Sequence, residues 1–132
     1  MTHVIRLITV VDVADTANQA RQSSVSARLE GVLADERRVV LLDDRGWAWT
    51  RSDGGDPWKL ESVEDMERTA RAVVGPDEPD EGRSRADVET EHWNALAQVL
   101  RRAGVEVAGA ELAALPHEVR LSDRVLRLMG TR

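Results

Sequence analysis

Residues 3–13 read HVIRLITVVDV, and this stretch decides the fold class. It is rich in β-branched residues and almost continuously apolar, with Arg6 as its single cationic side chain. An edge strand with one face in water shows alternating polarity, whereas a continuous apolar run is typical of a strand covered on both faces. We therefore expect a central β-strand here.

The segment that follows along the chain, residues 25–33, fits two patterns. Val25, Leu29 and Val32 share one face of a helix, whereas Val25, Ala27 and Leu29 alternate as in a strand. Gly31 weakens the helical interpretation because glycine is a poor helix former. We favour the helix.

Two β-rich runs come next, RRVVLL at residues 37–42 and GWAWTR at residues 46–51. They flank Asp43, Asp44 and Arg45, which together with Gly46 make a turn-forming cluster. Turn residues between two such runs are typical of a β-hairpin. In the second strand, Trp47 and Trp49 would point to the same side, because side chains two apart share a face.

The rest of the chain predicts helices. An amphipathic pattern begins at Ser62 and ends at Gly75-Pro76, and a second one covers residues 86–103. Between them, residues 75–85 contain the tandem PDEPDE, which we interpret as an exposed, acidic, proline-rich linker. A short helix at residues 110–115 and a final helix capped by Ser122 complete the order.

This order of elements predicts an α+β fold. We expect a small sheet with strands near residues 3–13, 37–42 and 46–51, helices on one face of it, and a helical C-terminal part. Residues 1–132 would form a single domain, with the apolar stripe around Trp93 packing back across the linker onto the sheet.

Composition excludes several classes of protein. The chain has no cysteine, so it can form no disulfide, thiolate nucleophile or cysteine-based metal site. A net charge of −6 opposes binding to the phosphate backbone of nucleic acids. With no signal-peptide pattern and no apolar run long enough to span a membrane, we expect a soluble, cytoplasmic protein that contacts neither nucleic acid nor membrane.

One candidate ligand pair lies on the predicted helix at residues 86–103. Glu89 and His92 form an E-x-x-H pair, the spacing at which one helix can offer two metal ligands. Proteins that bind metal in this way use a second such pair, and the chain contains none. The simpler interpretation, which we favour, is a first-turn acid stabilised by the helix dipole beside a histidine at the edge of the core.

A second candidate site comes from carboxylates that follow predicted strands. Asp12 and Asp15 follow the first strand, and Asp43 and Asp44 follow the second. If those strands were parallel neighbours, the four side chains would gather at one sheet edge, where few carboxylates and several waters can bind Mg²⁺. The simpler alternative is that they make turns and solvate strand ends.

Other catalytic patterns are missing. No serine lies in a G-x-S-x-G elbow, and neither phosphate-binding nor dinucleotide-binding glycine motifs are present. We therefore predict no cofactor. The tryptophans Trp47, Trp49 and Trp58 are candidates for an interface, but in a chain without Phe or Tyr a role in the core is favoured.

The leading hypothesis is a non-catalytic protein–protein interaction module, accessory or inhibitor-like rather than an enzyme. It would bind a partner with a basic surface through an acidic face or through the tryptophan-bearing hairpin. The alternative is a small metal-assisted hydrolase or ligand-binding protein that uses the clustered carboxylates and His92.

Overall fold

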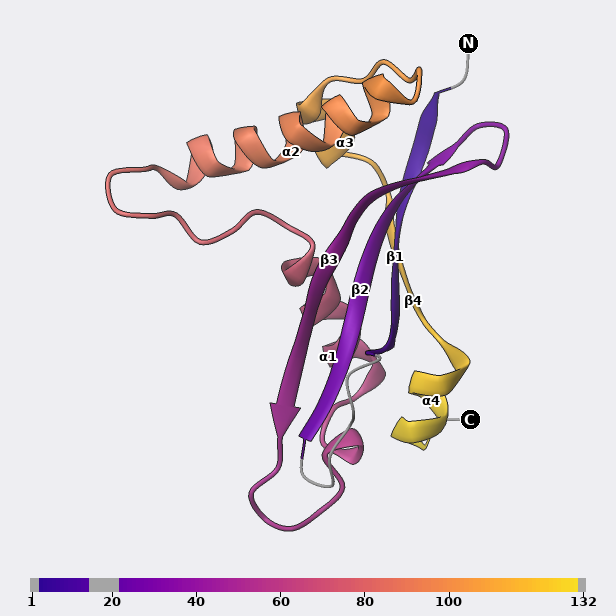
Figure 1. The fold of residues 1–132 in the computed structure, drawn as a ribbon, viewed down its shortest axis with the longest axis vertical. Helices are drawn as coiled ribbons and strands as arrows, with labels where there is room; N and C mark the ends of the chain where they lie inside the picture. Colours follow the sequence, from indigo (N-terminus) through magenta and orange to yellow (C-terminus); the bar gives the residue numbers. More distant parts are fainter. Residues whose placement is uncertain (1–2, 15–21, 131–132) are drawn as a thin grey trace.

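The computed structural model describes residues 3–14 and 22–130. It contains a four-stranded mixed sheet and four α-helices, so the predicted α+β class is confirmed (Figure 1). In chain order the elements are β1 (Val4–Val13), β2 (Gln22–Leu33), β3 (Arg38–Thr50), a 3-10 turn (Pro57–Lys59), α1 (Val63–Val73), α2 (Arg85–Arg102), α3 (Gly109–Ala113), β4 (His117–Leu121) and α4 (Asp123–Met129).

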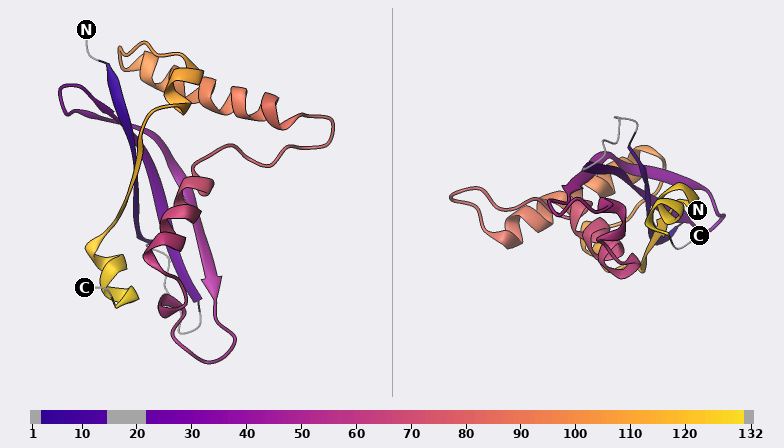
Figure 2. Two further views of the ribbon diagram at one scale, coloured as in Figure 1. Left: turned by 180° about the vertical axis from the view of Figure 1, so that it is seen from behind. Right: turned by 90° about the horizontal axis from the view of Figure 1, so that it is seen from below.

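The strands lie in the order β3-β2-β1-β4. β2 is antiparallel to both of its neighbours, whereas β4 is parallel to β1. β1 therefore lies inside the sheet with a partner on each side, as its apolar sequence predicts. The parallel return to β4 requires a crossover, and α1, α2 and α3 supply it on one face of the sheet (Figures 1 and 2).

The inner face of the sheet, which the helices cover, carries two groups of buried apolar residues. The first joins the sheet to α2 and α3 through Leu7, Leu29, Leu96, Leu100 and Leu112, and Trp93 packs against it. This contact confirms that the stripe around Trp93 packs back onto the sheet. The second group joins the other end of the sheet to α1, α4 and the 3-10 turn, and its members are Val11, Val13, Val25, Trp58, Met66, Ala70, Val125 and Met129.

Helix boundaries follow the capping residues closely. The Ser62 hydroxyl accepts the Asp65 amide at the start of α1, and the hydroxyls of Ser84 and Ser122 cap α2 and α4 in the same way. A serine oxygen at this position satisfies one of the amides that the first helical turn leaves unpaired. No helix in the described part of the chain is long and apolar enough to cross a membrane.

The helix predicted at residues 25–33 is wrong, because this segment is strand β2. Its side chains alternate in burial, with Val25, Ala27 and Leu29 buried and Ser26 and Arg28 exposed. Sheet pairing on both sides of β2 satisfies its backbone and makes the period of two decisive.

The predicted hairpin at residues 37–51 is also wrong. Residues Arg38–Thr50 form one strand, β3, which pairs with β2 along its whole length. Instead of turning, Asp43 and Asp44 lie where the register shifts, as in a β-bulge. Gly46 is needed here for close approach, since a Cβ atom would lie 2.5 Å from the carbonyl oxygen of Val25.

Strand β4 was not expected from the sequence. It is five residues long and lies within the part of the chain that we expected to be helical. Val119 and Leu121 pack against the inner-face core, whereas Glu118 and Arg120 are exposed. A strand this short offers little periodicity of its own, and its pairing with β1 determines its conformation.

Candidate functional site

Residues 77–91, which we call the acidic arm, hold most of the net charge of the chain. They contain seven carboxylates and two arginines, a formal charge of −5 in a chain of −6. Figures 1 and 2 show that this segment and the first turns of α2 extend beyond the edge of the sheet. All of its residues except Pro79 and Val88 are exposed.

Ion pairs neutralise part of this charge. Arg45, Arg85 and Arg83 bind Asp77, Glu78 and Glu91, respectively. The hydrogen bond from Arg83 holds the pKa of Glu91 below its ordinary value. The arm's other carboxylates form no ion pair with a described residue, and they are Asp80, Glu81, Asp87 and Glu89. The hydrogen bond to Glu91 raises the pKa of Arg83, and the charges of Asp80 and Asp87 also act on Arg83 and help to raise it.

Arg45 holds the base of the arm against the body of the protein. From β3 its guanidinium donates to the carbonyl of Val73 at 3.0 Å and to the carboxylate of Asp77 at 3.1 Å. It therefore joins the sheet, the C-terminal end of α1 and the start of the arm. Cationic groups stabilise the C-terminal end of a helix, where carbonyl oxygens lack partners.

A first hollow, of about 360 Å³, lies between residues 77–83 of the arm and helix α2. His92 contributes to its wall, and the Nε2 atom of this residue is buried with no hydrogen-bond partner among the described residues. Burial lowers the pKa of His92, and the nearby guanidinium of Arg45 lowers it further, so the imidazole is neutral near pH 7. The lining residues are Asp77, Glu78, Asp80, Arg83, Val88, Glu91, His92 and Ala95.

A second hollow, of about 330 Å³, lies between α2 and α3. Glu89 and Trp93 line it together, as expected for residues four apart on a helix. Glu89 and His92, the pair predicted as metal ligands, thus line different hollows. The described residues contain no group of three or more His, Asp or Glu side chains that could hold a metal ion.

The carboxylates predicted to gather at a sheet edge lie apart. Asp12 lies one residue before the end of β1, where it accepts a hydrogen bond from the hydroxyl of Ser122, whereas Asp43 and Asp44 lie within β3. β2 separates those two strands, so the assumption that they are neighbours is wrong. Asp15 lies outside the described residues.

The three tryptophans named as candidates for an interface pack on one another. The ring centroids of Trp49 and Trp58 are 5.0 Å apart in an edge-to-face arrangement, and Trp47 stacks on Trp49 at 6.4 Å. Trp58 is buried, and the indole nitrogen of Trp49 donates to the carbonyl of Pro57. Trp47 and Trp49 are only half-buried, so the choice between core and interface differs from one tryptophan to the next.

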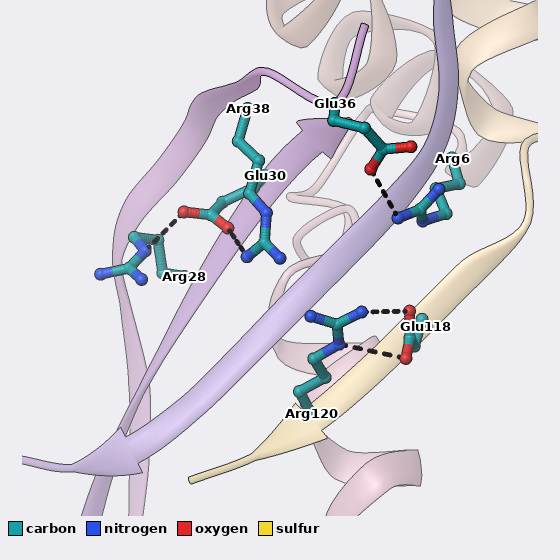
Figure 3. Close-up of polar contacts among 7 residues, drawn as sticks. All are labelled: Arg6, Arg28, Glu30, Glu36, Arg38, Glu118 and Arg120. Carbon is teal, nitrogen blue, oxygen red and sulfur yellow. Dashed lines mark hydrogen bonds and ion pairs between the residues drawn. The ribbon is translucent and has the colours of Figure 1, made fainter. Parts of the chain in front are cut away.

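The outer face of the sheet, opposite α1, α2 and α3, carries a layer of charged side chains (Figure 3). At its centre, the carboxylate of Glu30 accepts from Arg28 at 3.0 Å and from Arg38 at 3.1 Å, and its side chain is only 8% exposed. Ile8 and Val32 lie on this same face and are nevertheless buried. The aliphatic parts of long charged side chains are able to cover apolar surface in this way. The continuous apolar pattern of β1 therefore reflects helices on one face and this charged layer on the other.

Two more ion pairs complete the charged layer (Figure 3). Arg6 lies 3.6 Å from Glu36, and Arg120 binds Glu118 at 3.1 Å. The hydrogen bond from Arg120 lowers the pKa of Glu118. Each carboxylate of this layer thus has an arginine partner, which makes the outer face less suited than the acidic arm to attract a charged ligand.

Sequence reasoning missed both hollows. A signal for the second one was present, since Glu89 and Trp93 were each singled out, but the partner helix α3 contributes only small residues that carry no pattern. The fold and the site together define an α+β protein with an acidic projection and two hollows beside it. No protein-family model, curated protein or solved structure matches the chain, so its function is inferred from its own residues.

Proposed function

We propose that the chain is a non-catalytic protein–protein interaction module, accessory or inhibitor-like, whose acidic arm binds a partner with a basic surface. The observation that carries this proposal is the set of four exposed arm carboxylates that have no ion-pair partner among the described residues. Unpaired carboxylates on a projecting segment are open to arginine or lysine side chains of another protein.

The physical basis is electrostatic complementarity. A concentrated negative charge raises the rate at which a positively charged surface docks and disfavours acidic partners. Because the carboxylates are exposed, their attraction is screened by salt over roughly 10 Å at 0.1 M ionic strength. Binding should therefore weaken strongly as salt is raised.

The competing proposal is a small metal-assisted hydrolase or ligand-binding protein. It has less support, because Glu89 and His92 line different hollows and Asp12, Asp43 and Asp44 lie apart. Metal analysis of the purified protein tests it. Bound metal that is lost in both Glu89→Ala and His92→Ala would favour it over the interaction module.

The experiment for the interaction module is titration with a peptide of alternating glycine and arginine, followed by calorimetry at low and high salt. Asp80→Asn, Glu81→Gln and Asp87→Asn combined remove three charges of the arm that form no ion pair, and they leave the residues of its ion pairs in place. We expect this variant to lose about tenfold or more in affinity, since each charged contact contributes on the order of 1 kcal/mol.

The matched control removes three exposed carboxylates elsewhere, in Asp43→Asn, Glu64→Gln and Glu111→Gln. Its net charge equals that of the arm variant, so non-specific attraction falls equally in both. We expect the control to bind nearly as the unmodified protein does. Equal losses in the two variants would show that the arm is no specific site and would contradict the proposal.

A further inference from the structure

We propose that the second hollow, between α2 and α3, receives an arginine side chain of the basic partner. This inference rests on the proposed function and adds to it the particular group that is recognised. The hollow, of about 330 Å³, is at the small end of ligand pockets, which suits a single side chain better than a cofactor.

The polar groups of the hollow are all suited to accept hydrogen bonds. Glu89 supplies a carboxylate, Thr90 a hydroxyl and Asn94 an amide oxygen, and none of the arginine, lysine and histidine residues that the structure describes lines the hollow. The side chains of these three residues have no hydrogen-bond or ion-pair partner among the described residues. A ligand that brings several donors and a positive charge would satisfy them, and guanidinium carries five N–H donors in a plane.

Trp93 supplies the aromatic part of the site. Its side chain is half-buried and packs against the core that joins α2 to the sheet. The indole also lies edge-to-face with the imidazole of His92, with the two ring centroids 5.0 Å apart. These contacts hold the indole in place before any ligand arrives. Tryptophan is the best partner for cation–π contacts, and the planar guanidinium of arginine can also stack on it.

α3 forms the opposite wall with small residues, Gly109, Ala110 and Ala113. A Cβ atom on Gly109 would overlap the Oδ1 atom of Asn94 and lie 3.0 Å from its backbone nitrogen. Glycine at this position therefore allows α3 to approach α2 closely, and the alanines leave the space between the helices open.

Two single substitutions test the site at exposed positions, so that the core is left intact. Glu89→Gln removes the charge, and Ala113→Leu fills the hollow from α3. Their matched controls are Glu111→Gln, which removes an exposed carboxylate that does not line the hollow, and Ala114→Leu, which enlarges the exposed residue that follows α3. Far-UV circular dichroism and urea unfolding confirm that each variant folds.

The probes are peptides of alternating glycine with arginine, lysine or uncharged citrulline, together with the tetramethylammonium ion. The readouts are affinity and the NMR resonance of the Trp93 indole N–H, assigned by its loss in Trp93→Phe. We expect the arginine peptide to shift this resonance, and Glu89→Gln and Ala113→Leu each to weaken its binding about tenfold. Lysine should bind several-fold more weakly than arginine, and citrulline not at all.

Several outcomes would overturn this inference. They are equal binding of the lysine and arginine peptides, an unmoved Trp93 resonance, and variants that bind as their controls do. Tighter binding of tetramethylammonium than of arginine would assign the hollow to a small quaternary amine instead. If the triple arm variant loses binding while Glu89→Gln and Ala113→Leu retain it, the proposed function is supported and the arginine site is rejected.

Discussion

Glu30 offers the sharpest test of how the outer face of the sheet is stabilised. In Glu30→Gln the side chain keeps its shape but loses its charge and one of its two acceptor oxygens. One of the hydrogen bonds from Arg28 and Arg38 is therefore lost, because an amide NH2 group would face a guanidinium, and the other is weakened because its acceptor is neutral. Charge-assisted hydrogen bonds contribute about 1.5–3 kcal/mol and neutral ones about 0.5–1.5 kcal/mol. Two such bonds are affected, at 3.0 and 3.1 Å.

The exposure of the partners reduces the expected loss. The side chains of Arg28 and Arg38 are 50% and 40% exposed, so water can solvate both guanidinium groups once the carboxylate is gone. The lost bond and the weakened one should therefore together lower the free energy of unfolding by about 1–2 kcal/mol. Because Glu30 itself is buried, most of this loss should persist at high salt.

The assay is urea unfolding followed by tryptophan fluorescence, with the free energy extrapolated linearly to water. Glu36→Gln is the matched control, since it makes the same chemical change at a carboxylate that is 74% exposed and 3.6 Å from Arg6. Exposed pairs contribute little, so we expect a loss of less than about 0.5 kcal/mol. If Glu30→Gln costs no more than Glu36→Gln, the charged layer does not stabilise the sheet in the way described.

Three further predictions concern the inner face and the arm. Arg45→Met should lower the free energy of unfolding by about 1–2 kcal/mol, because hydrogen bonds to α1 and to the arm are lost. It should also speed amide exchange at residues 75–84, and unchanged exchange there would count against the role of Arg45. In the same urea assay, Gly46→Ala should lower the free energy of unfolding by about 1–3 kcal/mol, since the new Cβ atom would overlap the backbone of β2. Gly31→Ala should lower it less, because the atom nearest to its Cβ would be a side-chain methyl carbon 3.3 Å away. Burial lowers the pKa of both His92 and His117 below the ordinary value of 6.5, so the unfolded state takes up protons first and stability should fall as the pH is lowered through 6.5. Replacing both histidines by glutamine should flatten this profile, and a profile that keeps its slope would contradict the assignment.

The elements that could be predicted from the sequence are those whose signal is local. Serine caps and a period of 3.6 residues determine α1 and α2, and a continuous apolar run determines β1. The alternation in β2 was visible but ambiguous, because the same residues also fit a helical face. Which pattern prevails depends on the strands that pair with β2, and these are distant in sequence.

The errors in β3 and β4 have the same origin. Asp43, Asp44 and Gly46 have the composition of a turn, yet the long partner strand β2 holds them in extended conformation and accommodates the extra residue as a bulge. β4 takes its conformation from β1, which no short-range pattern reveals.

The candidate site was predictable only in part. The negative charge of the acidic arm is evident in its sequence, and so is the presence of Glu89 and Trp93 on one helix. Which carboxylates are left unpaired is not evident, since the pairing of Asp77 depends on Arg45, which comes from β3 and is distant in sequence. The second hollow depends on the approach of α3, which Gly109 allows.

The most direct test of the central claim is zero-length cross-linking of the protein in its native cells, which joins carboxylates to lysine amines that touch them. Mass spectrometry of the cross-linked peptides then identifies the residues on each side. We expect the cross-links to join Asp80, Glu81 and Asp87 to lysines on a basic surface of the partner. These cross-links should be lost when the three carboxylates are neutralised. Cross-links spread over carboxylates such as Asp43, Glu64 and Glu111 as often as over the arm would contradict the claim that the acidic arm is the binding surface.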